Sequence, residues 1–178
     1  MNKDKQDVWA PLRFFVGSWK GGSSKSKTER DYEFILEGKF LRVRNKSTFK
    51  PTEKNPKGEI HEDIGFFSYD NNRKVLVFRQ FHVEGFVNQY VLKIPADNDK
   101  TIEFVTESIE NIPHGWRARE TCIILNDDEF TETFELAAPG KDFEICAKTH
   151  LKRRKVGEAK QSEHNLSLNT SVNGCMHA

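Results

Sequence analysis

The chain has 178 residues, of which 36% are hydrophobic and 31% charged, and its formal net charge is +1. This length suits one domain with a sizeable core. The near-neutral charge gives no argument for a nucleic-acid partner or an anionic membrane surface. No run approaches the ~20 apolar residues of a membrane span, and the polar N-terminus lacks the apolar stretch of a secretory signal. We therefore expect no nucleic-acid partner and no membrane span.

The cysteines favour the cytoplasm as the compartment. Cys122, Cys146 and Cys175 are odd in number and widely spaced, and no two of them form a CxxC motif. This spacing predicts neither a disulfide framework nor a zinc site. The reducing cytoplasm is the default for such a chain.

The first predicted element is a short helical turn over residues 9–16, after Pro11. From residue 17 onward, short alternating segments are separated by turn-forming Gly, Asn, Asp and Pro residues. The predicted strands are residues 17–25, 28–37, 40–49, 59–69, 74–83, 86–94, 100–108, 116–126, 129–137 and 143–154. Short connections imply antiparallel neighbours, and so many strands remove their unpaired edges most simply by closing.

The predicted fold is therefore all-β: a ten-stranded antiparallel up-and-down barrel with a short N-terminal helical turn. We expect residues 9–154 to form a single barrel domain. Residues 1–8 and 155–178 lack the alternating pattern, and we interpret both as tails.

The hairpin between the second and third predicted strands indicates which side chains face inward. A two-residue turn at Gly38-Lys39 aligns apolar residues on one face and opposite charges on the other. A one-residue slip would exchange the two faces. The residues expected to point inward are Tyr32, Phe34, Leu36, Leu41 and Val43.

The middle strands leave two faces open as the wall of the lumen. One face carries Glu62, Arg79, Asn88 and Tyr90; the other carries His61, Asp63, Gln80, His82 and Gln89. We favour the first face because Lys93, on the second, prefers water. Arg79 with Tyr90 and Glu62 would suit recognition of a buried carboxylate.

The same middle-strand pairing sets His61 opposite His82, near Asp63. Two histidines and a carboxylate could bind a divalent metal, although this pattern supplies no firm third ligand.

The hairpin between the eighth and ninth predicted strands adds two charged residues to an otherwise apolar face. A turn at Asp127-Asp128 places Arg119 and Glu132 on the face that carries Ile123, Phe130 and Phe134. An unpaired charge is costly inside a protein, so both residues would need partners, water or a ligand.

Gly17-Ser18-Trp19, which follows the apolar segment Phe14-Phe15-Val16, resembles the first-strand signature of the calycin superfamily. In that superfamily the Trp packs across the closed end of the barrel, under an Arg of the last strand. The resemblance implies that Trp19 and Arg153 form the barrel floor, since an Arg over an indole ring is a favourable cation–π pair.

Within the superfamily the chain is similar to nitrobindin-like and fatty-acid-binding-protein-like barrels. The similarity rests on the segment from Pro11 to Trp19, on residues 65–70 (Gly-Phe-Phe-Ser-Tyr-Asp), and on His150-Leu151 before Arg153. Nitrobindins bind haem b through a His near the end of the barrel and are associated with nitric oxide and peroxynitrite. The resemblance therefore implies haem b as a candidate cofactor and His150 as its ligand.

The leading functional hypothesis is intracellular binding of a small hydrophobic ligand, lipid-like or carboxylate-bearing, in the barrel cavity. One alternative is a haem-binding barrel with His150 as ligand. Another is a small-molecule enzyme with Glu62 or His82 as acid/base, although we favour a protein that is not an enzyme. A homodimer is left open. The candidate ligand-binding residues are Tyr32, Phe34, Glu62, Arg79, Asn88, Tyr90, Arg119 and Glu132.

Overall fold

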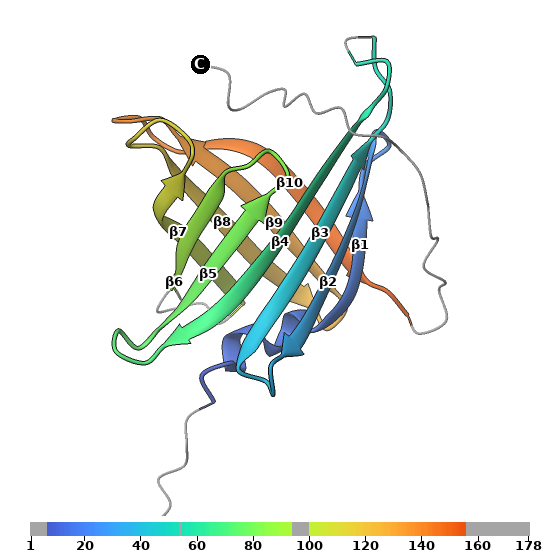
Figure 1. Ribbon diagram of the computed structural model, residues 1–178. Helices are drawn as coiled ribbons and strands as arrows, with labels where there is room; N and C mark the ends of the chain where they lie inside the picture. The colour runs from blue at the N-terminus through green and yellow to red at the C-terminus, as the bar shows by residue number, and fades with distance from the viewer. Residues whose placement is uncertain (1–6, 54, 94–99, 156–178) are drawn as a thin grey trace, which may run out of the picture.

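The fold is taken from a computed structural model that describes residues 7–53, 55–93 and 100–155 (Figure 1). A short 3-10 helix, η1 (Ala10–Phe15), precedes ten strands. These are β1 (Gly17–Gly22), β2 (Ser26–Ile35), β3 (Phe40–Phe49), β4 (Glu59–Asp70), β5 (Val75–His82), β6 (Val87–Lys93), β7 (Thr101–Glu110), β8 (Arg117–Asn126), β9 (Glu129–Ala137) and β10 (Glu144–Arg153). Most of the predicted tail residues, 1–8 and 155–178, lie outside the described residues.

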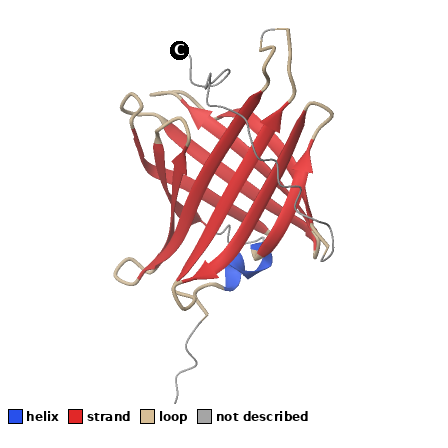
Figure 2. Cartoon of the chain, turned by 45° about the vertical axis from the view of Figure 1, so that its right-hand side comes forward, coloured by secondary structure: helices blue, strands red, loops and turns tan. Residues whose placement is uncertain are grey.

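The strands form one closed antiparallel barrel in which each strand pairs with its neighbours in the chain (Figures 1 and 2). The ring is completed by β1 and β10, which pair only at Trp19–Arg153, Lys20–Lys152 and Gly21–Leu151. Glycine is needed at residue 21 because a Cβ there would lie 2.3 Å from the carbonyl oxygen of His150. The predicted all-β, ten-stranded up-and-down barrel is thus confirmed.

Helix η1 closes one end of the barrel, below the strands in Figure 2. Its Leu12 and Phe15 side chains are buried, and the Trp19 indole N–H donates to the Phe15 carbonyl at 2.6 Å. The Arg153 guanidinium carbon lies 4.2 Å from the centroid of the Trp19 ring. Arg153 also donates to the carbonyl oxygens of Phe14 and Val16, each at 2.8 Å. These contacts tie the helix to both the first and the last strand.

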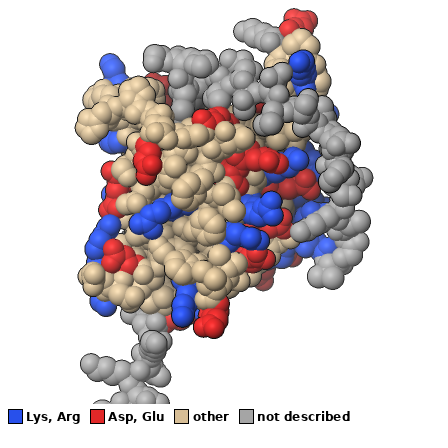
Figure 3. All heavy atoms as spheres, in the orientation of Figure 1, with Lys and Arg blue, Asp and Glu red and all other residues tan. Residues whose placement is uncertain are grey.

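The outer surface of the barrel carries charges of both signs. Figure 3 shows Lys and Arg side chains interspersed with Asp and Glu over one face. Several face each other across neighbouring strands, as Lys46 and Glu62 do at 3.4 Å. Such exposed pairs contribute little stability, and they leave no broad field of one sign.

Among the described residues, no helix combines the length and the hydropathy needed to cross a membrane.

The β2–β3 hairpin differs from the prediction by a shift of two residues. Tyr32 pairs with Val43 and Phe34 with Leu41, so the predicted inner face is kept. Leu36 belongs to the turn, has φ 50°, and is 67% exposed. Its predicted inward placement is therefore wrong, because the turn contains four residues and ends the strand before Leu36.

A β-bulge in β8 exchanges the faces that the sequence predicts for this strand. The register shifts between Ile124 and Asn126, so Cys122 pairs with Glu132. One extra residue on one strand turns every side chain beyond it to the opposite face. Glu120 and Cys122 therefore face the lumen, and the predicted inward placement of Arg119 is wrong.

The turn between β5 and β6 also differs from the prediction by one residue, and this changes the predicted pairing of the middle strands. The backbone N–H of His82 donates to the Phe86 carbonyl at 3.2 Å, so the turn contains three residues rather than two. Gln80 consequently pairs with Asn88, and Phe78 with Tyr90. The lumen wall combines Asn88 and Tyr90 of the favoured face with residues of the rejected face on β4 and β5.

Candidate functional site

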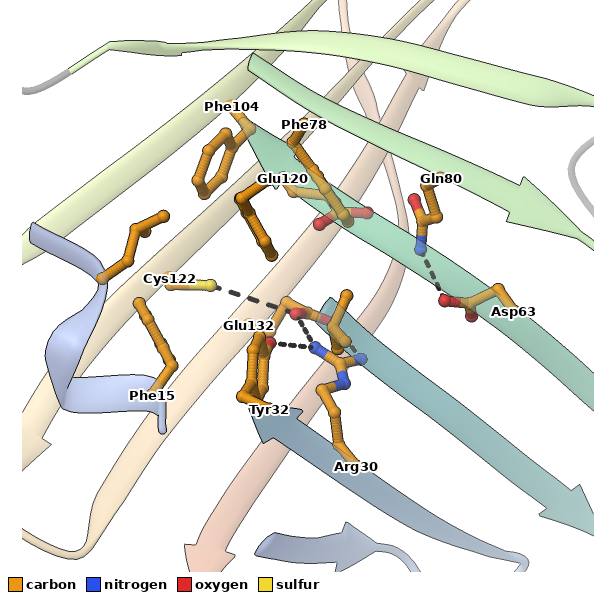
Figure 4. Close-up of a pocket in the computed structure, with 13 residues that line it drawn as sticks. Phe15, Arg30, Tyr32, Asp63, Phe78, Gln80, Phe104, Glu120, Cys122 and Glu132 are labelled. Carbon is orange, nitrogen blue, oxygen red and sulfur yellow. Dashed lines mark hydrogen bonds and ion pairs between the residues drawn. The ribbon is translucent and has the colours of Figure 1, made fainter. Parts of the chain in front are cut away.

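A cavity of about 20 Å³ lies inside the barrel, between an apolar floor and a ring of polar side chains (Figure 4). Space for one water molecule needs roughly 10–15 Å³, so the cavity takes one group of that size. Its apolar lining is Leu12, Phe15, Tyr32, Val43, Phe67, Phe78, Phe104 and Cys122, and its polar lining is Arg30, Asp63, Gln80, Glu120 and Glu132.

Arg30 and Glu132 form a buried ion pair on the wall of this cavity. The pair joins β2 to β9, with Arg30 Nη2 2.9 Å from Glu132 Oε1 and Nη1 bonded to the other carboxylate oxygen. Arg30 also donates to Asn45 Oδ1 at 3.3 Å and to the Tyr32 hydroxyl at 3.4 Å. The single guanidinium of the lining is thus engaged by groups of the protein itself.

Asp63 is held by two amide side chains. Asn45 Nδ2 donates to Asp63 Oδ2 at 2.8 Å, and Gln80 Nε2 donates to Asp63 Oδ1 at 3.0 Å. The second contact fixes the orientation of the Gln80 amide, because only its NH₂ end can donate to a carboxylate. Gln80 is 8% exposed, yet its Oε1 has no hydrogen-bond partner among the described residues.

Glu120 is partly buried and receives a hydrogen bond from the Tyr90 hydroxyl at 3.4 Å. Burial, reinforced by the nearby Glu132 carboxylate, raises the pKa of Glu120 to about 8. Desolvation disfavours the charged form of a carboxyl. Glu120 is therefore mostly protonated at neutral pH.

Asn88 continues the polar ring toward the open end of the barrel. Its Nδ2 donates to the Tyr90 hydroxyl at 2.8 Å, while its Oδ1 is buried without a partner among the described residues. His82 lies beside it, with its ring 4.0 Å from that of Phe86. Burial lowers the pKa of His82, which favours the neutral imidazole.

The structure brings part of the predicted site together. Tyr32 and Glu132 line the cavity, and Tyr90 and Asn88 lie beside it. Phe34 lies at the closed end instead, its ring 5.5 Å from that of Trp9.

Three predicted site residues lie on the outer face. Glu62 is near Lys46, Arg79 donates to Gln89 at 3.0 Å, and Arg119 donates to Glu135 at 2.6 Å. The predicted Arg79–Tyr90–Glu62 group does not form, because Tyr90 faces the lumen and the other two do not.

Arg30, Asp63, Gln80 and Glu120 are cavity residues that the sequence analysis did not select. Arg30 could have been found by extending the alternation of Tyr32 one step toward the start of β2. Glu120 could not, because no sequence signal marks the bulge that turns it inward.

His150 lies on the outer face of β10, where Nε2 is 2.8 Å from Glu129 Oε2, and its side chain is 44% exposed. The next residue, Leu151, is the one that faces the lumen. His150 therefore cannot reach a group inside the barrel, and its predicted role as a ligand of iron there is wrong.

The cavity does not fit the haem that the resemblance implies. Its volume is that of one water-sized group, and its lining contains no histidine. A larger hollow of about 600 Å³ lies against β2–β5, lined mainly by charged side chains. The histidine at its edge, His82, directs Nε2 toward Asn88 at 3.3 Å.

The predicted pairing of His61 with His82 is also absent. His61 pairs with Ser47, and its Nδ1 lies 2.5 Å from Glu84 Oε1. Within the described residues, no group of three or more His, Cys, Asp or Glu side chains is placed to hold a metal ion.

Comparisons with known proteins agree with this architecture. The family model described as "THAP4-like, heme-binding beta-barrel domain" matches residues 8–153. A solved structure, "Crystal Structure of Rv2717c from M. tuberculosis", superposes with a TM-score of 0.58 at 16% identity. The alignment covers 84% of this chain and 98% of that one, and at this identity it supports the fold alone. No curated protein matches the chain. Because the family model spans most of the sequence, the chain belongs to the THAP4-like, heme-binding beta-barrel domain family.

Proposed function

We propose that this chain binds a small ligand inside its barrel, with the polar head of the ligand in the cavity beside Glu120. The observation that carries the proposal is a cavity inside the barrel whose lining includes three carboxyl groups. A barrel core needs no buried carboxyl groups, because burying a charge is costly even when it is paired. Polar groups retained around a cavity are typical of a ligand site.

The apolar part of the ligand would lie between the cavity and the open end of the barrel. Ala118 precedes Glu120 on the inward face of β8, Trp116 comes directly before that strand, and Phe134 of β9 pairs with Glu120. Trp116, Phe134 and Ile109 are only partly buried against the core. Covering them with an apolar body would remove about 25 cal/mol of unfavourable hydration per Å².

The charge balance argues against the carboxylate head expected from the sequence. Arg30 is the single cation in the lining, and Glu132 already pairs with it. A carboxylate in the cavity would also lie close to Asp63 and Glu120. We therefore favour a ligand with a neutral or cationic head.

The alternatives have less support. The family description names haem, but the cavity has neither the space nor the histidine that haem requires. Glu62, an acid/base candidate for an enzyme, is on the outer face. A binding protein rather than an enzyme, in the cytoplasm, remains our proposal; the compartment rests on the cysteine spacing alone.

Titration with hexanol, hexylamine and hexanoate, followed by two-dimensional NMR, tests the proposal. We expect at least one of these six-carbon probes to shift signals of Glu120, Gln80 and Phe134. Cys122→Met should weaken that binding about tenfold or more, because the longer side chain occupies the space that the head group needs.

Ile123→Met provides the matched control, because Ile123 is the exposed neighbour of Cys122 on the outer face. It should leave the affinity unchanged within about twofold. The proposal is overturned if no probe shifts the inward-facing signals, or if both variants bind equally well.

A further inference from the structure

We infer that the head group recognised in this cavity is a primary ammonium. The inference rests on the proposed function, since it names the chemistry of the ligand that the barrel would bind. It is carried by the balance of hydrogen-bond donors and acceptors around the cavity.

Three carboxyl groups line the cavity against one guanidinium: Asp63, Glu120 and Glu132 against Arg30. The guanidinium is paired with Glu132. Asp63 is bonded only by the amides of Asn45 and Gln80, and Glu120 only by the Tyr90 hydroxyl. Within the described chain, neither Asp63 nor Glu120 has a cationic partner within ion-pair distance, so the cavity can accommodate one additional positive charge.

The unpartnered atoms of the polar ring are acceptors. Gln80 Oε1 and Asn88 Oδ1 are both buried without a donor in the described part of the chain. The Gln80 amide lines the cavity and is oriented by its bond to the Asp63 carboxylate, so it cannot turn its NH₂ end to the cavity without losing that bond. Asn88 donates to the Tyr90 hydroxyl beside the cavity. A buried unsatisfied acceptor costs about 1–3 kcal/mol, which a ligand N–H would offset.

An ammonium group matches this site in size as well as in charge. It is a compact cation with three donors, comparable in size to the single water that a cavity of about 20 Å³ accepts. A hydroxyl could satisfy one acceptor but would leave the carboxyl charge unbalanced.

Binding of a cation should be linked to the ionisation of Glu120. The groups that surround this carboxyl are Glu132 on β9, Arg30 on β2, Asp63 on β4 and Tyr90 on β6. Its neighbour on β8, Cys122, has a pKa raised by burial and stays neutral. Because the Glu120 carboxyl is mostly protonated below pH 8, an ammonium that binds there releases one proton. The affinity for the amine should therefore rise with pH.

Isothermal titration calorimetry of hexylamine, hexanol and hexanoate between pH 6 and 8.5 tests the inference. We expect hexylamine to bind at least about tenfold more tightly than hexanol at pH 8, and hexanoate to bind most weakly. The hexylamine affinity should rise by up to about tenfold per pH unit below pH 8, because one proton is released. Buffers of different ionisation enthalpy would reveal that proton directly.

Glu120→Gln should remove the pH dependence and weaken hexylamine binding about tenfold or more, while hexanol binding stays within about twofold. Glu62→Gln is the matched control, since Glu62 is on the outer face and its side chain is 56% exposed; it should change none of these values.

The outcomes separate the inference from the proposed function. If hexanol or hexanoate binds as tightly as hexylamine, the inference of an ammonium head group is wrong, while the proposal of a ligand site in the barrel is kept. If none of the three probes binds, the proposed function itself fails. Should Glu120→Gln not fold, the unsubstituted protein still decides: a hexylamine affinity that is flat from pH 6 to 8 overturns the inference.

Discussion

At the scale of single residues, Glu120 is a carboxyl group kept neutral by its surroundings. Apolar walls and the Glu132 carboxylate raise its pKa, and Arg30 lowers it only in part. The unfolded chain would ionise the same carboxyl near pH 4. Between about pH 4 and pH 8, folding is therefore accompanied by the uptake of a proton, and this links the stability of the barrel to pH.

The free energy of unfolding should fall as the pH rises from about 5 to 8, by at most about 1.4 kcal/mol per pH unit from this residue. In that pH interval Glu120 is ionised in the unfolded state and protonated in the folded state, so a higher pH stabilises the unfolded state. Glu120→Gln should remove this dependence and become the more stable protein at pH 8. Urea unfolding of both proteins at pH 5, 6.5 and 8 measures the difference.

The titration of His61 does not affect the comparison between the unsubstituted protein and Glu120→Gln. Glu84 raises the pKa of His61, so its contribution is also lost as the pH rises, but it is lost equally from both proteins. A Glu120→Gln effect that is constant from pH 5 to 8 would show that Glu120 titrates in its ordinary range.

At the scale of elements, strand existence and strand register were predictable to different degrees. Alternation located all ten strands because each has one apolar face. The register of a hairpin depends on the length of its turn, and one additional turn residue shifts the register by one. The β5–β6 turn, for example, holds three residues where two were expected. A shift of two residues in the β2–β3 hairpin kept Tyr32 inside, whereas the bulge in β8 exchanged Arg119 for Glu120.

The candidate site was therefore predictable only in part. The even shift in the β2–β3 hairpin kept Tyr32 inside. Glu132, Asn88 and Tyr90 were found because the sequence assigned the correct inward face to β9 and β6, although the partners of these strands were shifted by one residue. Asp63, Gln80 and Glu120 are polar residues on inward faces, and a pattern based on hydrophobicity assigns such residues to solvent. Only the three-dimensional pairing of the strands identifies them.

Arg153 is the residue that joins the last strand to both the first strand and the helix. Arg153→Met keeps an unbranched apolar stem but loses the cation–π contact, three bonds to backbone carbonyls and an exposed ion pair with Asp128. We expect a loss of about 2 kcal/mol in the free energy of unfolding, measured with urea.

Lys152→Met is the control for that loss, because Lys152 contacts Glu129 at 3.0 Å on the exposed face. Exposed pairs contribute about 0–1 kcal/mol. Equal effects of the two substitutions would mean that the closed end gains no particular stability from Arg153.

At the scale of the whole molecule, the family description and the interior of this chain differ. The family is described as haem-binding, whereas this barrel encloses a cavity of about 20 Å³ without a histidine in its lining. We expect hemin titration to give the same absorption spectra for the unsubstituted protein and for His150→Ala, because His150 faces away from the lumen.

The same variant should change stability by no more than about 1 kcal/mol, since the pair of His150 with Glu129 is exposed. A Soret band that appears with the unsubstituted protein and disappears with His150→Ala would contradict this placement of β10.

The narrow seam between β1 and β10 has a consequence for how the barrel folds. Most of the sequence separates these strands, and they share only three residue pairs. Closing so long a loop costs chain entropy before any contact compensates for it, and three pairs offset little of that cost. Hairpins between chain neighbours should form earlier, so we expect the ring to close last. Until Trp19 and Arg153 meet, the Glu120 carboxyl group is exposed to water and ionises as an ordinary acid.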